Sequence, residues 1–376
     1  MSLVPLSSRL QPAVPRPRLY AGADQPARLS LEIDSIEDGG TVPVVVQDVL
    51  HLPFCALTRL VRSDRQAQPK VLLVAPLSCH FPILLRDVVL GLLPDYEVFL
   101  TDWVNARYVP LHCGPFELAD NVSCVLEAMR AIGPGLHVLA LCQGAIPALV
   151  ATAHHADSGA DCAPCSLVLV AAPVDPAANP TRVSRMLKAR ALSWYERSVI
   201  RPVPAARPGE GRLVYPASMQ LLGLWTYLAR HIREGGELLA KLLRDDGADP
   251  VRFPFLDLYS ALMDLPAEVF LDIVRHVYSE RTLACGRLRI GNAAPSLRAI
   301  RTTALMTVEG EYDDIAAPNQ TARAHDLCPS VSRDARRKLI VPACGHFSLF
   351  HGRIWRTHVL PEVRAFLRQS AGAGAG

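Results

Sequence analysis

The residues most able to do chemistry in this chain surround a single cysteine. Cys142 stands where an apolar run ends and an alanine-rich helical pattern begins, in the motif Ala140-Leu141-Cys142-Gln143-Gly144. Strand, sharp turn and helix in this order are typical of a nucleophile elbow, which presents the central residue of G-x-S-x-G on a strained turn above a sheet. The small residues Ala140 and Gly144 on either side agree with such an elbow, because the strand and helix backbones approach closely there. A cysteine at the centre would act as a thiolate. The alternative is an inert core cysteine, since cysteine is among the most buried residue types.

A cysteine nucleophile needs a base and an orienting acid, and two later segments offer them in the expected order. In Met306 to Asp314, a glycine turn directly after a strand places Asp313 at the carboxyl edge of the sheet. In Leu339 to Phe347, the pair Gly345-His346 presents an imidazole after the next strand. We therefore predict Cys142, Asp313 and His346 as nucleophile, acid and base. Asp314 is the alternative acid. Both aspartates could instead begin a helix as a cap and first-turn charge, and His346 could be a hydrogen-bonded loop histidine.

Acyl transfer also needs preorganised N–H donors for the oxyanion. One is predicted at the backbone N–H of Gln143, immediately after the nucleophile. The other is predicted in the loop after an earlier strand, Pro76 to His80, at Leu77 or Ser78. An ordinary strand-to-helix turn with Ser78 as the helix cap explains that loop equally well.

The elements that would position these residues alternate along the chain between short β-rich runs and longer helical patterns. Such alternation predicts a mostly parallel sheet covered by helices on both faces. The expected strands are 41–46, 70–75, 96–101, 136–141, 166–171, 304–308 and 338–341. The expected helices are 81–93, 116–132, 318–327 and 351–369, with Pro361 bending the last.

The alternation is interrupted once, which predicts the domain organisation. Helical periodicity with little strand character fills residues 176–300, so we expect a helical lid inserted into an α/β-hydrolase fold. The predicted divisions are a proline-containing tail, the first part of the core, the lid, the second part of the core and a flexible tail: 1–35, 36–175, 176–300, 301–369 and 370–376.

Composition excludes several classes of protein. The net charge is +3, and no Lys/Arg cluster is interleaved with aromatics, so no nucleic-acid partner is expected. No apolar run is long enough for a membrane span, and no secretory signal is evident, so we expect a cytoplasmic protein with reduced cysteines. The only C-x-x-C, Cys162 to Cys165, lacks a second ligand pair, so no metal site is predicted.

These motifs, together with their surroundings, resemble the intracellular polyhydroxyalkanoate depolymerases, chiefly the poly(3-hydroxybutyrate) type. The likeness covers most of residues 40–368. The matching segments are Val74-Ala75-Pro76-Leu77-Ser78 with His80-Phe81, Thr101-Asp102-Trp103 with Ala106-Arg107, Cys142-Gln143, Val214-Tyr215-Pro216, Asp264-Leu265-Pro266-Ala267-Glu268 with Leu271-Asp272, Thr307-Val308-Glu309-Gly310-Glu311, Ala324-His325-Asp326-Leu327-Cys328 and Gly345-His346.

The resemblance implies an α/β-hydrolase fold whose Cys-Asp-His triad hydrolyses ester bonds of stored polyester at the granule surface in the cytoplasm. Carried over, the triad is Cys142, Asp313 and His346, and no metal or organic cofactor is implied. One position departs from the family, whose members usually have proline after Cys-Gln where this chain has Gly144. The oligomeric state is not predicted.

A water-insoluble polyester needs an apolar docking surface, which the lid aromatics Trp194, Tyr195, Trp225 and Tyr227 could supply. Buried core is the alternative interpretation of such residues.

Two other functions stay open. Polyhydroxyalkanoate synthases resemble these depolymerases and transfer acyl groups from coenzyme A, but they tend to have two glycines after the nucleophile and Asp-His-Ile, where this chain has one glycine and Asp313-Asp314-Ile315. A granule-associated protein that has lost catalysis is the third possibility. The intact Cys142, Asp313 and His346 argue against it.

Overall fold

The computed structural model describes residues 31–77, 82–157, 163–291 and 294–371. Most of the two predicted tails lies outside these ranges, and β1 begins at Ser35 while α12 continues to Ala371. In the described part, the main sheet has nine strands in the order β1-β2-β3-β5-β4-β6-β7-β11-β12. Their bounds are β1 Ser35–Glu37, β2 Thr41–His51, β3 Cys55–Arg62, β4 Lys70–Val74, β5 Glu97–Trp103, β6 Leu136–Leu141, β7 Ser166–Val170, β11 Ala304–Gly310 and β12 Arg336–Val341.

The sheet is mostly parallel, as predicted. All neighbouring pairs from β5 to β12 are parallel, whereas β1, β2 and β3 form an antiparallel edge. The central strands β6, β7 and β11 are buried along their whole length, which explains their continuously apolar sequences. Strand β3 was not predicted. Its Arg59 and Arg62 break the apolar run, and both are bound by carboxylates in the folded protein.

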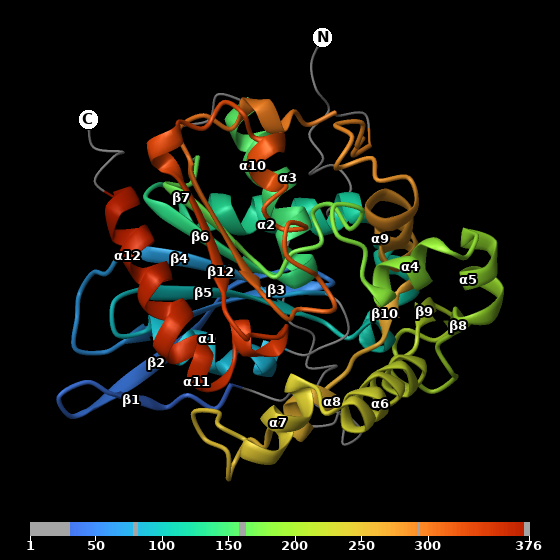
Figure 1. Ribbon diagram of the computed structural model, residues 1–376, viewed down its shortest axis with the longest axis horizontal. Helices are drawn as coiled ribbons and strands as arrows, with labels where there is room; N and C mark the ends of the chain where they lie inside the picture. Colours follow the sequence, from blue (N-terminus) through green and yellow to red (C-terminus); the bar gives the residue numbers. More distant parts are fainter. Residues whose placement is uncertain (1–30, 78–81, 158–162, 292–293, 372–376) are drawn as a thin grey trace.

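Helices cover both faces of this sheet. Figure 1 shows α1, α11 and α12 on one side and α2 and α3 on the other. The helices that pack on the sheet are α1 Arg86–Leu92, α2 Leu118–Ile132, α3 Ala145–Asp157, α10 Ala324–Leu327, α11 Gly352–Ile354 and α12 Leu360–Ala371.

Most elements between β7 and β11 lie beyond one end of the sheet, at the right and bottom of Figure 1. The predicted helices are present there, but three very short strands also form a separate sheet in the order β10-β9-β8. At two or three residues each, these strands carry no periodic signal. The elements are α4 Arg182–Lys188, α5 Leu192–Ser198, β8 Arg201–Pro202, β9 Leu213–Tyr215, α6 Ala217–Glu234, α7 Glu237–Arg244, α8 Phe255–Ser260, β10 Leu265–Pro266 and α9 Ala267–Ile273, followed by a π-helical turn at Val274–Ser279.

Two predicted helices differ in detail. The helix expected over 318–327 is present only from Ala324, because Asn319 adopts a left-handed conformation (φ 78°) that a helix cannot contain. The helix expected over 351–369 contains a π-helical turn at Trp355–Val359, directly before α12. Pro361 has no N–H to donate to the preceding turn, and the wider turn accommodates that loss.

Three buried histidines make the free energy of unfolding depend on pH. Burial lowers the pKa of His137, His325 and His351 from 6.5 to about 4. Between these two values the unfolded chain takes up protons that the native protein does not bind. The free energy of unfolding therefore falls as the pH falls from 6.5 towards 4.

We expect His137→Asn to weaken this acid sensitivity. Asparagine can keep the hydrogen bond to Ser166 Oγ, which lies 2.8 Å from His137 Nδ1. Denaturant titrations from pH 7 to pH 4 should show a loss of unfolding free energy smaller than that of the wild type by about 3 kcal/mol. An unchanged pH dependence in the variant would contradict the assignment.

Candidate active site

The turn around Cys142 has the strain expected of a nucleophile elbow. Strand β6 ends at Leu141, and Cys142 adopts a left-handed conformation with φ 49°, which is unfavourable for a non-glycine residue. Helix α3 then begins at Ala145. A Cβ atom at Gly144 would lie 2.7 Å from the carbonyl oxygen of Val74 and 2.8 Å from that of Ala75. The small residue predicted after the nucleophile is thus required by contact with the end of β4.

The structure brings the predicted acid and base together. His346 Nδ1 donates a hydrogen bond to Asp313 Oδ2 at 2.8 Å, and both side chains are buried. The other oxygen, Asp313 Oδ1, accepts the backbone N–H groups of Ile315 and Ala316, each at 2.8 Å. Asp313 therefore closes a turn of its own loop with one oxygen and binds the imidazole with the other. It is not a helix cap, because the next helix, α10, begins only at Ala324.

Backbone contacts hold the acid and base loops side by side. The N–H of Tyr312 donates to the carbonyl of Cys344 at 2.9 Å, and Glu311 Oε2 accepts the N–H of Ala343 at 2.8 Å. A Cβ at Gly310 would lie 2.4 Å from the Cys344 carbonyl oxygen. The separation between Asp313 and His346 is thus set by direct contact between the loops that follow β11 and β12.

The environment of His346 favours its protonated form. Burial acts to lower its pKa, but the neighbouring Asp313 and Cys142 side chains, through charge and hydrogen bonding, raise that pKa well above 6.5. His346 thus has hydrogen bonds to the other two members of the predicted set. A thiolate beside an imidazolium is the arrangement that activates a cysteine for attack on a carbonyl.

The neighbouring Asp314 faces a different part of the molecule. Its carboxylate is bound by Tyr227 Oη, by the guanidinium of Arg230 and by His231 Nε2, all from α6. Asp313, and not Asp314, is the aspartate hydrogen-bonded to His346. These three partners are 83 to 87 residues away in the sequence, and no sequence pattern indicated the contact.

The predicted oxyanion loop is only partly described. Ser78 lies outside the described residues, whereas Leu77 is buried after the end of β4. The start of this loop is fixed by β5: the N–H of Ala75 donates to Thr101 Oγ1 at 2.9 Å, and Trp103 Nε1 donates to the Ala75 carbonyl at 2.8 Å. Gln143 follows Cys142 in the short helical turn Cys142–Gly144, whose last residue lies against the carbonyls of Val74 and Ala75.

Other motif segments quoted from the sequence also meet in space. The guanidinium of Arg107 binds both oxygens of Asp264, at 2.9 and 2.8 Å, and Asp264 Oδ1 also accepts the N–H of Ala217 at the start of α6. Asp272 Oδ2 accepts the N–H of Leu118 at the start of α2. These residues join the segment 176–300 to the core. Arg107, Asp264 and Asp272 belong to the segments that carry the resemblance, but the sequence alone assigned them no role.

The described residues contain neither a metal-binding cluster nor a membrane-spanning helix. There, no group of three or more His, Cys, Asp or Glu side chains lies close enough to hold a metal ion. In the same ranges, no helix combines the length and the apolar character needed to cross a membrane.

Several solved structures are similar to this chain at low sequence identity. An esterase from Thermogutta terrifontis is 13% identical, over 90% of this chain and 98% of that chain, with a TM-score of 0.46. A 2-hydroxy-6-oxo-6-phenylhexa-2,4-dienoate hydrolase from Rhodococcus sp. strain RHA1 is 15% identical, over 87% and 100%, with a TM-score of 0.49. A carboxylesterase from Bacillus subtilis is 14% identical, over 93% and 97%, with a TM-score of 0.46. No curated protein matches the sequence significantly.

A family comparison is more specific. Residues 171–371, more than half of the chain, match the family model described as PHB de-polymerase C-terminus. This range includes Asp313 and His346, while Cys142 precedes it. The chain therefore belongs to the PHB depolymerase family and is a carboxylic ester hydrolase with an α/β-hydrolase fold.

Proposed function

We propose that this enzyme hydrolyses stored poly(3-hydroxybutyrate)-type polyester through Cys142, Asp313 and His346. The observation that carries the proposal is the 2.8 Å hydrogen bond between His346 and Asp313, with Cys142 on a strained turn and close enough to His346 to raise the pKa of its imidazole. The site has the parts needed for acyl transfer: a nucleophile, a base and an orienting acid.

The reaction proceeds in two halves. His346 takes the proton of Cys142, and the thiolate attacks an ester carbonyl while the backbone N–H of Gln143 and a donor at Leu77 or Ser78 hold the oxyanion. When the tetrahedral intermediate collapses, the carbon–oxygen bond breaks. The hydroxyl end of the leaving chain then receives the proton from His346. Water, deprotonated by His346, hydrolyses the thioester, releasing an acid and restoring the thiol.

Asp313 orients His346 and stabilises the imidazolium that forms in each half of the reaction. Its second oxygen is occupied by two backbone N–H groups, which prevents the carboxylate from rotating away. No step of this route requires a metal or an organic cofactor.

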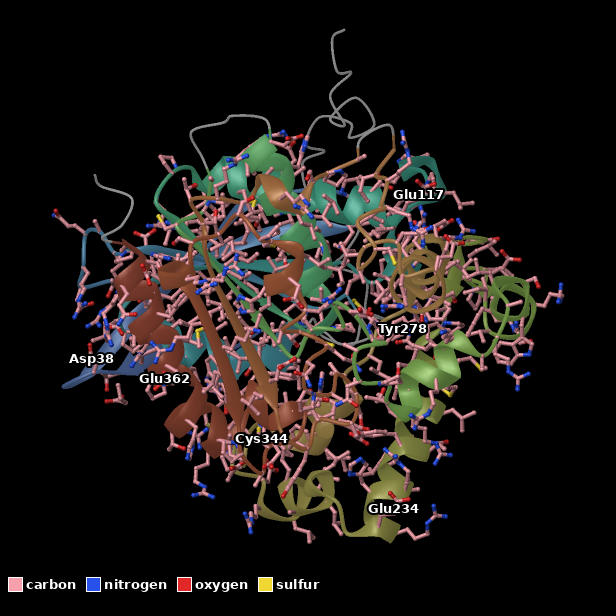
Figure 2. The ribbon with its side chains drawn as sticks, turned by 45° about the horizontal axis from the view of Figure 1, so that its top comes forward. Asp38, Glu117, Glu234, Tyr278, Cys344 and Glu362 are labelled. Carbon is pink, nitrogen blue, oxygen red and sulfur yellow. The ribbon has the colours of Figure 1, made fainter. Side chains whose placement is uncertain are left out.

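We further propose that residues 176–300 act as a lid and that α6 docks on the granule surface in the cytoplasm. Support comes from an apolar stripe on the outer face of α6, where Leu222, Trp225 and Ile232 are 64%, 44% and 53% exposed. With the exposed Ala229, they recur at helical spacing on one side of the helix. Glu234, the last residue of α6, lies at the edge of the molecule in Figure 2. Exposed apolar stripes of this kind mark interaction surfaces.

The predicted lid aromatics differ in their environment. Trp225 lies on the exposed stripe, whereas the hydroxyl of Tyr227 is turned towards Asp314. Tyr195 is buried and Trp194 is partly exposed. Exposed and buried positions are thus both represented among the four residues.

Replacing the nucleophile tests the mechanism. We expect Cys142→Ala and Cys142→Ser to reduce the release of 3-hydroxybutyrate from amorphous granules by roughly a thousandfold or more, because the residues of a triad act as a unit. Cys285→Ser, at an exposed cysteine, is the matched control and should keep full activity. Undiminished turnover in Cys142→Ala would reject the mechanism. Polymer formation from hydroxybutyryl-coenzyme A would instead identify a synthase.

Docking by α6 predicts a split between insoluble and soluble substrates. The triple variant Leu222→Gln, Trp225→Gln, Ile232→Gln should hydrolyse granules about tenfold more slowly, since loss of about 1.4 kcal/mol of apolar binding has that effect. Turnover of a soluble butyrate ester should not change. The double variant Val46→Gln, Ile340→Gln serves as the control, because it alters two similarly exposed apolar residues that lie on strands β2 and β12, away from α6. An equal loss on both substrates would argue against docking.

A further inference from the structure

Helix α6 contacts the loop of the predicted acid directly and is connected to the loop of the predicted base through α8. On the acid side, Tyr227, Arg230 and His231 bind the carboxylate of Asp314, the residue next to Asp313. On the base side, Tyr259 Oη donates to the carbonyl of Leu224 at 3.2 Å.

The second contact continues to the base through aromatic rings. The ring of Tyr259, in α8, packs edge-on against Phe347 at 5.3 Å between centroids. Phe347 in turn packs edge-on against His346 at 5.4 Å. Helix α6 is thus connected to the Asp313 loop by direct contact and to the His346 loop through Tyr259 of α8.

The position of Asp314 in its loop makes the first contact consequential. Asp313 Oδ1 accepts N–H groups from Ile315 and Ala316, so the peptide units of Asp314 lie inside the turn that Asp313 closes. A displacement of Asp314 must therefore displace that turn. The same turn is held from a second side, because Thr181 Oγ1, at the N-cap of α4, donates to the Ile315 carbonyl at 3.2 Å.

The charge of Asp314 is maintained by its partners. Burial alone would raise its pKa, but hydrogen bonds from Tyr227 and Arg230 and the nearby charges of His231 and Arg230 hold that pKa below its usual value. Asp314 and Arg230 are 35% and 18% exposed as side chains, so their interaction is less screened than that of a surface pair.

We propose that Asp314 is a positioning residue: held by α6, it fixes the turn from which Asp313 orients His346. This rests on the proposed function. It assigns to α6 a task beyond covering the site, namely keeping the acid in hydrogen-bonding register with the base. A displacement of a few tenths of an ångström in the acid weakens the interaction that keeps the imidazolium charged, and with it the thiolate.

The test compares Asp314→Asn with a matched carboxylate elsewhere on the same lid. Asp246 is 29% exposed, binds Lys241 of α7 at 3.3 Å and accepts the N–H of Arg353, without contact to the Asp313 turn. Asp246→Asn therefore removes the same charge from a similar lid-to-core contact. Melting temperature, kcat and KM on a soluble butyrate ester, and the rate of Cys142 alkylation by iodoacetamide against pH are measured for wild type, both variants and Tyr227→Phe.

We expect Asp314→Asn to lower kcat about tenfold while KM changes less than twofold, and to move the alkylation profile of Cys142 towards higher pH. Tyr227→Phe should shift both readouts in the same direction by a smaller amount. Asp246→Asn should lower the melting temperature only. An Asp314→Asn enzyme with wild-type kcat and alkylation profile would overturn the proposal. If that variant does not fold, wild-type values for both readouts in Tyr227→Phe overturn it equally.

The outcome for the proposed function is read separately. Wild-type activity in Cys142→Ser would reject the thiolate mechanism whatever Asp314→Asn does. Loss of activity in Cys142→Ser together with a silent Asp314→Asn would reject only the positioning role.

Discussion

The organisation of this molecule depends on a hydrogen bond between two buried charged groups, Asp313 and His346. Burying such a pair is costly unless each remaining polar atom is also bound. The fold meets that requirement with backbone groups: two N–H donors from the next residues fill the second oxygen of Asp313. The β11 and β12 loops are hydrogen-bonded to each other, so the pair does not depend on side-chain packing alone.

The parallel sheet makes this arrangement possible. Val74 pairs with Ala140 and Leu141 with Val170, and on the far side Gly310 pairs with Val341, so the strands end near one edge. The loops of Asp313 and His346, which follow Cys142 by 171 and 204 residues in the sequence, therefore lie at the same edge. Close backbone contact at Gly144 and Gly310 replaces side chains where the loops must approach. In Figure 2, Cys344 marks the loop after β12 that makes one of these contacts.

Much of this could be predicted from local sequence. The turns that carry Cys142, Asp313 and His346 could be predicted because each follows a short apolar strand and contains a glycine. The antiparallel strand β3 was not, because its arginines are neutralised by distant carboxylates such as Glu97. The contact of Asp314 with α6 could not be predicted either. It joins polar and charged side chains that are far apart in the sequence, and no repeating pattern indicates which of them will pair. The choice of Asp313 over Asp314 followed a spacing rule that matches the hydrogen bond to His346.

The π-helical turn at Trp355–Val359 has a consequence for the end of the chain. A π turn adds one residue to the helical path, which rotates everything after it by about 100° relative to an uninterrupted helix. Trp355 and Val359, the first and last residues of the π turn, and Val363 and Leu367 after it are all fully buried. The apolar side of α12 thus faces the sheet only because of this phase correction. Deleting one amino acid from that turn would leave the sequence of α12 unchanged but rotate its apolar face towards the solvent.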